Sequence, residues 1–122
     1  MKILKRGNDD GAAAVEAAIV FPVLIMMIFG LLGLGLVLSA YQAMNHAAYE
    51  GARYAALGQT APEVKERVHE VMDSVTSSGL VDVDEPESTG CVDGQAEVTV
   101  TATVHAVVLD LPIEAKGVEK CA

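Results

Sequence analysis

The feature that most constrains this chain is an uncharged run near its N-terminus. Residues Ala17 to Ala40 are 24 residues without Asp, Glu, Lys, Arg, His, Asn or Gln. A helix of that length measures about 36 Å, whereas a bilayer core is about 30 Å thick and needs about 20 apolar residues. A cleaved secretory signal has a shorter apolar region of about 7–15 residues. The run therefore predicts one transmembrane helix.

The charges on either side of the run predict its orientation. Lys2, Lys5 and Arg6 precede it, and positive charges beside an apolar segment tend to stay in the cytoplasm. We therefore expect a single-pass protein of the inner (cytoplasmic) membrane with an extracytoplasmic C-terminus. Residues 59–122 carry four Lys or Arg and thirteen Asp or Glu. That acidity excludes nucleic acid as a partner and is typical of a solubilising surface.

Helical patterning continues beyond the apolar run. Small or apolar residues recur at helical spacing and predict one buried stripe: Ala40, Met44, Ala47, Ala48, Gly51 and Ala55. Gly58 is a plausible end of this helix. Pro22 removes one backbone hydrogen bond, so we expect a kink there. On the opposite side, Glu50 and Arg53 are spaced to form a weak ion pair.

The remaining residues predict a small α+β domain. Thr60 and Glu63 form a capping box, and an apolar stripe follows until Gly79. Residues 96–106 alternate in polarity, which predicts a half-buried strand. We expect partner strands at 80–83 and 113–121, a turn at Asp93-Gly94, a break at Leu111-Pro112 and an acidic loop at 82–89. The fold class is thus a long transmembrane helix that extends out of the membrane, a short helix and a small antiparallel sheet.

Two cysteines, Cys91 and Cys121, lie in the part that we place outside the cytoplasm. An oxidising compartment favours a disulfide between them. In the chain-entropy model a loop of this size contributes about 3–4 kcal/mol, which a small domain with little core needs. The alternative is two free thiols.

No catalytic constellation stands out, so we expect no enzyme and no cofactor. The histidines His46, His69 and His105 lie in three different elements. His69 with Glu66 and Glu70 reads as a solvated helix face rather than a metal site. The acidic loop, with Asp82, Asp84, Glu85 and Glu87, offers oxygen ligands that Ca²⁺ prefers, but it lacks the EF-hand pattern and reads as a plain loop.

One carboxylate, Glu16, stands at the start of the apolar run, where charge is expensive. It is either an interfacial residue favoured by the helix dipole or a residue with a partner. Cleavage after Gly11 would free the α-amine of Ala12 and make Glu16 the fifth residue of the new chain. A positive charge would then lie one helical turn away, within the chain or on a neighbour.

These residues resemble a known family. Gly11 followed by "AAAVE" and a long apolar helix looks like a class III prepilin signal. The chain from Gly11 to about Gly58 is similar to the TadE-like proteins of the Tad (Flp) pilus system. The matching positions are the signal, the proline and the segment EGARYA after the membrane: Gly11, Glu16, Pro22, Glu50, Gly51, Ala52, Arg53, Tyr54 and Ala55. Ala17 departs from the family, which often has Phe there.

The resemblance implies a processing route and a set of partners. A prepilin peptidase would cut between Gly11 and Ala12, and the mature chain would join other pilins or pseudopilins, with Glu16 assisting assembly. The expected organisation is a leader at 1–11, a transmembrane and extended helix at 12–58, and an extracytoplasmic αβ domain at 59–122. The expected function is a minor pilin or pseudopilin-like component of Tad pilus assembly. Two alternatives remain: a type II secretion-like pseudopilin, and an unprocessed single-span anchor with an acidic extracellular binding domain.

Overall fold

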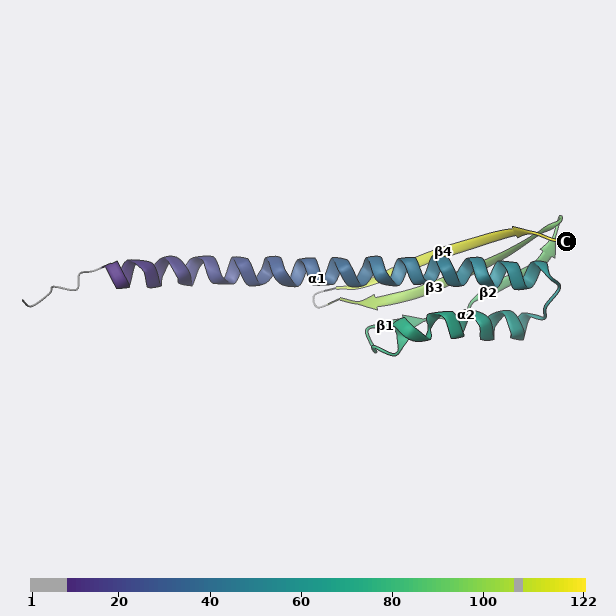
Figure 1. Ribbon diagram of the computed structural model, residues 1–122, viewed down its shortest axis with the longest axis horizontal. Helices are drawn as coiled ribbons and strands as arrows, with labels where there is room; N and C mark the ends of the chain where they lie inside the picture. Colours follow the sequence, from purple (N-terminus) through teal and green to yellow (C-terminus); the bar gives the residue numbers. More distant parts are fainter. Residues whose placement is uncertain (1–8, 107–108) are drawn as a thin grey trace, which may run out of the picture. The chain divides into compact units, whose positions relative to one another are not determined.

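The computed structural model describes residues 9–106 and 109–122 and shows two helices followed by four strands (Figure 1). The helices are α1 (Asp9–Ala56) and α2 (Ala61–Thr76). The strands are β1 (Val81–Val83), β2 (Glu87–Val92), β3 (Gln95–His105) and β4 (Asp110–Lys120). This order confirms the predicted fold class, a long apolar helix, a short helix and a small antiparallel sheet.

The chain divides into two compact units, residues 1–32 and residues 33–122. We call them unit 1 and unit 2. The described part of unit 1 is helix α1 up to Leu32, and every side chain from Gly11 to Leu32 is exposed. The stretch Gly11–Ala56 of α1 is long and apolar enough to cross a bilayer. The leader, helix and domain boundaries expected from the sequence concern processing and topology, and they stay a prediction.

Helix α1 is continuous across Pro22, so the proline does not end the helix; the kink stays a prediction. The helix ends at Ala56, two residues before the expected end at Gly58. Gly58 follows with φ of +81°, a conformation that glycine adopts without steric cost. The backbone N–H of Gln59 then donates to the Tyr54 carbonyl at 3.2 Å, which satisfies an orphan carbonyl at the helix end.

Helix α2 begins where the capping box predicted. The Glu63 carboxylate accepts hydrogen bonds from the backbone N–H and from the hydroxyl of Thr60, both at 2.8 Å. These bonds hold the pKa of Glu63 below its ordinary value. Helix α2 buries Val64, Val68 and Met72, which belong to the predicted apolar stripe.

Strand β3 is central and antiparallel to all the other strands. It pairs with β4 along its whole length on one side, and with β1 and β2 on the other. Its inward positions, from Ala96 to Val104, are buried at every second residue, as the alternation predicted. The β2–β3 turn is Asp93-Gly94, with φ of 52° and 78°, the backbone that a two-residue hairpin turn requires.

Two predictions about the strands were wrong. Residues 82–89 are not all loop, because β2 begins at Glu87 and pairs with β3. None of the residues of β2 is buried, so the strand has no apolar alternation in the sequence. Pro112 does not separate two strands either, since it lies within β4 opposite Thr103. An edge strand tolerates a proline because its missing N–H can face away from the ladder.

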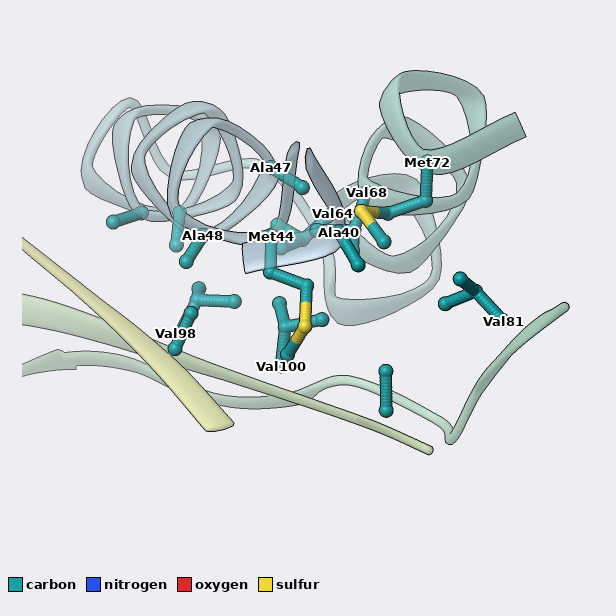
Figure 2. Packing of buried hydrophobic residues seen from close by; sticks show 14 of the residues in the cluster. Ala40, Met44, Ala47, Ala48, Val64, Val68, Met72, Val81, Val98 and Val100 are labelled. Carbon is teal, nitrogen blue, oxygen red and sulfur yellow. The ribbon is translucent and has the colours of Figure 1, made fainter. Parts of the chain in front are cut away.

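The core of unit 2 lies where α1, α2 and the sheet meet. Figure 2 shows Met44 extending from α1 toward Val100 of β3, while α2 directs Val64, Val68 and Met72 toward the same space. The predicted α1 stripe is buried throughout. Two glycines permit the closest approaches. A Cβ on Gly51 would lie 2.8 Å from Val68 and 3.1 Å from Val98, and a Cβ on Gly117 would collide with the Ala48 carbonyl.

Candidate processing and assembly sites

The predicted processing site lies in the first turns of α1. Gly11 and Ala12 are both helical and exposed. A Cβ on Gly11 would meet nothing within 4 Å, so the fold itself gives no reason for a glycine there. Glu16 is exposed on the same helix, a little more than one turn further on. The glycine therefore fits recognition by another molecule better than it fits packing.

The rest of unit 1 supplies an unpartnered apolar surface. Among the described residues of unit 1, the large side chains from Val15 to Leu32 are all strongly exposed. Phe21, Met26 and Leu31 retain 61%, 78% and 63% of their accessible surface. Exposed apolar surface on this scale marks contact with membrane or protein. Gly30 also has no neighbour within 4 Å, which leaves room for another helix to approach closely.

The EGARYA segment, Glu50 to Ala55, has an inner and an outer half. Gly51, Ala52 and Ala55 are buried against the core. Gly51 lies where Val64 and Val68 of α2 and Val98 of β3 converge. Any larger residue would push α1 away from α2 or from the sheet, because the atoms around this position already touch. The inner half of the segment is therefore a packing device for unit 2.

The outer half of the same segment holds an arginine of α2. The Arg67 guanidinium lies 5.6 Å from the Tyr54 ring centre and 3.8 Å from the Glu50 carboxylate. It also bonds Glu70 at 2.7 Å, and that bond, with the charge of Glu70, raises the pKa of Arg67. Glu50 thus pairs with Arg67 and not with Arg53, the partner that the sequence predicted. Sequence spacing within one helix could not reveal a partner on another helix.

A shallow pocket opens beside this contact. Its volume is about 370 Å³, and its lining consists of Glu50, Arg53, Tyr54, Leu57, Gln59 and Arg67. In the described part of the chain, Arg67 Nε is the one buried side-chain nitrogen or oxygen without a hydrogen-bond partner. Both arginines of unit 2 line the pocket, in a unit whose overall charge is negative.

The structure joins Cys91 to Cys121 by the predicted disulfide, with the Cα atoms 6.1 Å apart. Cys91 lies in β2, and Cys121 follows β4. Since β3 lies between those two strands, the disulfide ties the two outer strands at the end of the sheet that carries the Asp93-Gly94 turn. The backbone N–H of Cys121 also donates to the Gly94 carbonyl at 2.9 Å.

Acidic residues at 82–85 and His105 form ion pairs with residues of other elements. Within residues 9–106 and 109–122, no three His, Cys, Asp or Glu side chains gather as metal ligands would. Glu85 bonds Lys65 at 2.7 Å, which lowers the pKa of Glu85. His105 lies between two carboxylates: its Nδ1 is 2.7 Å from Asp110 and its Nε2 is 2.8 Å from Asp82. Bonds to both carboxylates raise the pKa of His105.

The sequence alone did not predict that His105 bonds Asp82 and Asp110. Asp82, His105 and Asp110 come from β1, β3 and β4, and only the strand register brings them together. The one signal present in the sequence was that His105 falls on the polar face of an alternating strand.

Comparison with known proteins supports the resemblance seen in the motifs. The family model of the TadE-like protein matches residues 11–53. No curated protein and no solved structure matches the chain. The matched residues run from the predicted cleavage site, through the exposed apolar helix, into the packed EGARYA segment. Over residues 11–53, the chain matches the family of TadE-like proteins.

Proposed function

We propose that this protein is a pilin-like, non-enzymatic component in the assembly of a Tad (Flp) pilus. The observation that carries the proposal is the described part of unit 1. Gly11, Glu16 and the apolar side chains up to Leu32 lie on one helix within the family match, and all of them are exposed in the part of the chain that the structure describes. A segment built in this way needs partners: an enzyme that recognises Gly11, a membrane for the apolar residues, and a positive charge for Glu16.

The proposed route has three steps. The chain inserts with its basic leader in the cytoplasm and with α2 and the sheet outside, so the membrane stores the uncharged run of α1. A prepilin peptidase then cuts between Gly11 and Ala12. The new α-amine of Ala12 pairs with Glu16 of the same or a neighbouring subunit, which offsets the cost of a carboxylate in a poorly hydrated place. Other pilins or pseudopilins of the Tad system pack against the apolar face.

Processing is tested by sequencing the N-terminus of protein extracted from the native membrane. We expect Ala12 as the first residue. Gly11→Leu should leave a chain that is longer by the leader, because the peptidase must fit the residue at the cut. Gly30→Leu is the matched control, since neither glycine has a packing neighbour; it should be processed normally. An N-terminus at Met1 in the unaltered protein would support the unprocessed anchor with an acidic extracellular domain.

The role of Glu16 is tested by Glu16→Gln, which keeps size and polarity but removes the charge. We expect insertion and cleavage to persist and assembly with partner pilins to fail. The measurement is recovery of partner subunits with the variant, at matched membrane levels, beside the control Glu66→Gln on the exposed face of α2. Full recovery of partners would mean that Glu16 is an interfacial charge favoured only by the helix dipole.

A type II secretion-like pseudopilin would have the same kind of start and is the second candidate. The EGARYA segment favours the Tad system, and so does the family match. The partners recovered in the Glu16 experiment separate the two systems, because each apparatus has its own subunits.

A further inference from the structure

The start of β4 lies beside the apolar part of α1 within unit 2. Gly117 of β4 packs directly on the backbone of Ala48 and Tyr49, and β4 runs alongside α1 (Figure 1). Leu111 precedes Gly117 by six residues, a distance of about 20 Å along a strand. Helix α1 covers the same distance in about 13 residues. Leu111 therefore lies level with about residue 35 of α1, and Leu109 lies further along in the same direction.

Residue 35 belongs to the uncharged run that ends at Ala40. The run measures about 36 Å as a helix and exceeds the bilayer core of about 30 Å by only a few ångströms. A group level with residue 35 lies about 8 Å before the end of the run. Because the run exceeds the core by about 6 Å in all, that level lies about 2–5 Å inside the acyl chains, near their boundary with the headgroups, when α1 spans the bilayer. Tyr41 comes directly after the run and is 46% exposed, as aromatic residues at this boundary often are.

The side chains at this level are apolar and uncovered. Leu109 is 63% exposed and Leu111 is 38% exposed. On α1, Leu34 and Leu38 keep 62% and 55% of their surface. We call these four leucines the apolar end of unit 2. Leu57 is equally exposed, at 63%, but it lies near the opposite end of unit 2. Exposure alone therefore does not distinguish these four leucines from Leu57. What distinguishes them is that they lie level with the uncharged run of α1.

The negative charge of Asp110, beside the apolar end, is partly compensated by His105. Asp110 lies between Leu109 and Leu111 in the sequence. Without a partner, its charged carboxylate would be costly to move into a poorly hydrated place. It bonds His105, which also bonds Asp82. When both ring nitrogens of His105 carry protons, one positive charge faces two negative ones, and each carboxylate has a charge-assisted hydrogen bond. This arrangement lowers the cost of holding Asp110 close to lipid.

We propose that Leu109 and Leu111 insert into the outer boundary of the bilayer beside α1, so that the sheet of unit 2 rests on the membrane. The same level of α1 carries Leu34 and Leu38, which are exposed as well. The insertion gives unit 2 a second attachment to the membrane besides the helix. The inference rests on the membrane embedding of α1 that the proposed function requires.

The chain contains no tryptophan, so a single introduced tryptophan reports on one position. The experiment uses the full chain in zwitterionic vesicles whose lipids are brominated near the headgroup end of the acyl chains, which quench a tryptophan that touches them. The test variant is Leu109→Trp. Leu24→Trp, in unit 1, reports whether α1 is embedded. Leu57→Trp reports on an equally exposed leucine near the opposite end of unit 2.

We expect a blue-shifted emission and a large loss of fluorescence for Leu109→Trp, close to that for Leu24→Trp. Leu57→Trp should keep a red emission and its full intensity. Leu111→Trp should give the same result as Leu109→Trp, so that the conclusion does not depend on a single substitution. A cooperative urea unfolding transition in each variant, like that of the unaltered protein, reports that unit 2 has folded.

The outcomes separate the inference from the proposed function. Quenching of Leu24→Trp without quenching of either Leu109→Trp or Leu111→Trp overturns the lipid contact and leaves the embedding of α1 intact. A blue shift without quenching at Leu109 would mean that protein covers it, and would also overturn the inference. Failure of Leu24→Trp to respond would overturn the membrane embedding, and the inference with it.

Discussion

Unit 1 and unit 2 use apolar residues in opposite ways. In the described part of unit 1 the apolar side chains of α1 are exposed throughout, whereas unit 2 buries its α1 stripe under α2 and the sheet. The two halves of α1 also differ in side-chain size. The exposed half carries large residues such as Ile, Leu, Phe and Met, and the buried positions of the covered half are mostly Ala, with one Gly and one Met. Large side chains suit a fluid surrounding such as lipid, while small ones let other elements approach the helix backbone.

The glycines make the same contrast sharper. Gly11 and Gly30 have no neighbour within 4 Å, while Gly51 and Gly117 have no room for a methyl group without displacing their neighbours. A glycine in unit 1 is thus available to an external partner, and a packed glycine in unit 2 serves the fold. We therefore expect substitutions at packed positions of unit 2 to lower its stability, and matched substitutions in unit 1 to leave it unchanged.

The largest effect on unit 2 should come from removing its disulfide. We expect Cys91→Ala with Cys121→Ala to lower the free energy of unfolding of unit 2 by about 3–4 kcal/mol, since the freed loop regains entropy in the unfolded chain. Urea unfolding of detergent-solubilised protein measures the loss. A reducing agent should destabilise the unaltered protein and leave the double variant unchanged. Insertion of α1 into membranes should be the same for both.

The next effect is expected at Gly117. Gly117→Ala places a methyl group against the Ala48 carbonyl, and since backbone atoms cannot turn aside, β4 or α1 must move. We expect a loss of about 1–3 kcal/mol. The matched change Gly30→Ala in unit 1 should leave the unfolding of unit 2 unaltered. Equal stability of the two variants would show that unit 2 is packed more loosely at this point.

A smaller effect, which depends on pH, is expected at His105. Its pKa is raised above the ordinary value of 6.5 by Asp82 and Asp110. The stabilisation by His105 is therefore complete below about pH 6.5 and is lost as the pH rises through the folded-state pKa. His105→Gln should be less stable than the unaltered protein at low pH, and the gap should narrow at high pH. A gap independent of pH would contradict the interpretation.

The smallest effect is expected at the start of α2. Glu63→Gln keeps the shape of the cap but weakens the bonds that Thr60 donates. Because the pKa of Glu63 is lowered in the fold, its contribution is present above about pH 4.5 and is lost as the pH falls through the folded-state pKa. We expect a slight fall in the thermal midpoint at neutral pH and none at strongly acidic pH. Glu66→Gln, outside the cap, is the reference.

Local patterns predicted much of this fold. The uncharged run indicated α1, the alternation around Val100 indicated β3, and Thr60 with Glu63 indicated the start of α2. Each signal lies within a few neighbouring residues, where the period of the helix or strand and the chemistry of the cap act directly. The disulfide was also predictable, because the chain has only two cysteines.

Contacts between elements were harder to predict from the sequence. Strand β2 was missed because it buries none of its residues and so lacks an apolar alternation. Pro112 was misinterpreted because its tolerance depends on β4 lying at the sheet edge. The pairing of Glu50 with Arg67 and the bonds of His105 to two aspartates depend on how helices and strands are placed in space. At the candidate processing site, Gly11 and Glu16 were found by motif, and the structure adds that both are exposed among the residues it describes.

The contact of Gly117 with Ala48 also bears on the order of events during synthesis. The ribosome must add roughly 70 residues after Ala48 before Gly117 exists, which takes several seconds at about 5–20 residues per second. The apolar run is complete long before that and is ready to enter the bilayer, while the Ala-rich continuation of α1 still has no sheet to cover it. The chain therefore has time to be anchored first and folded second, with β4 closing over α1 as one of the last events.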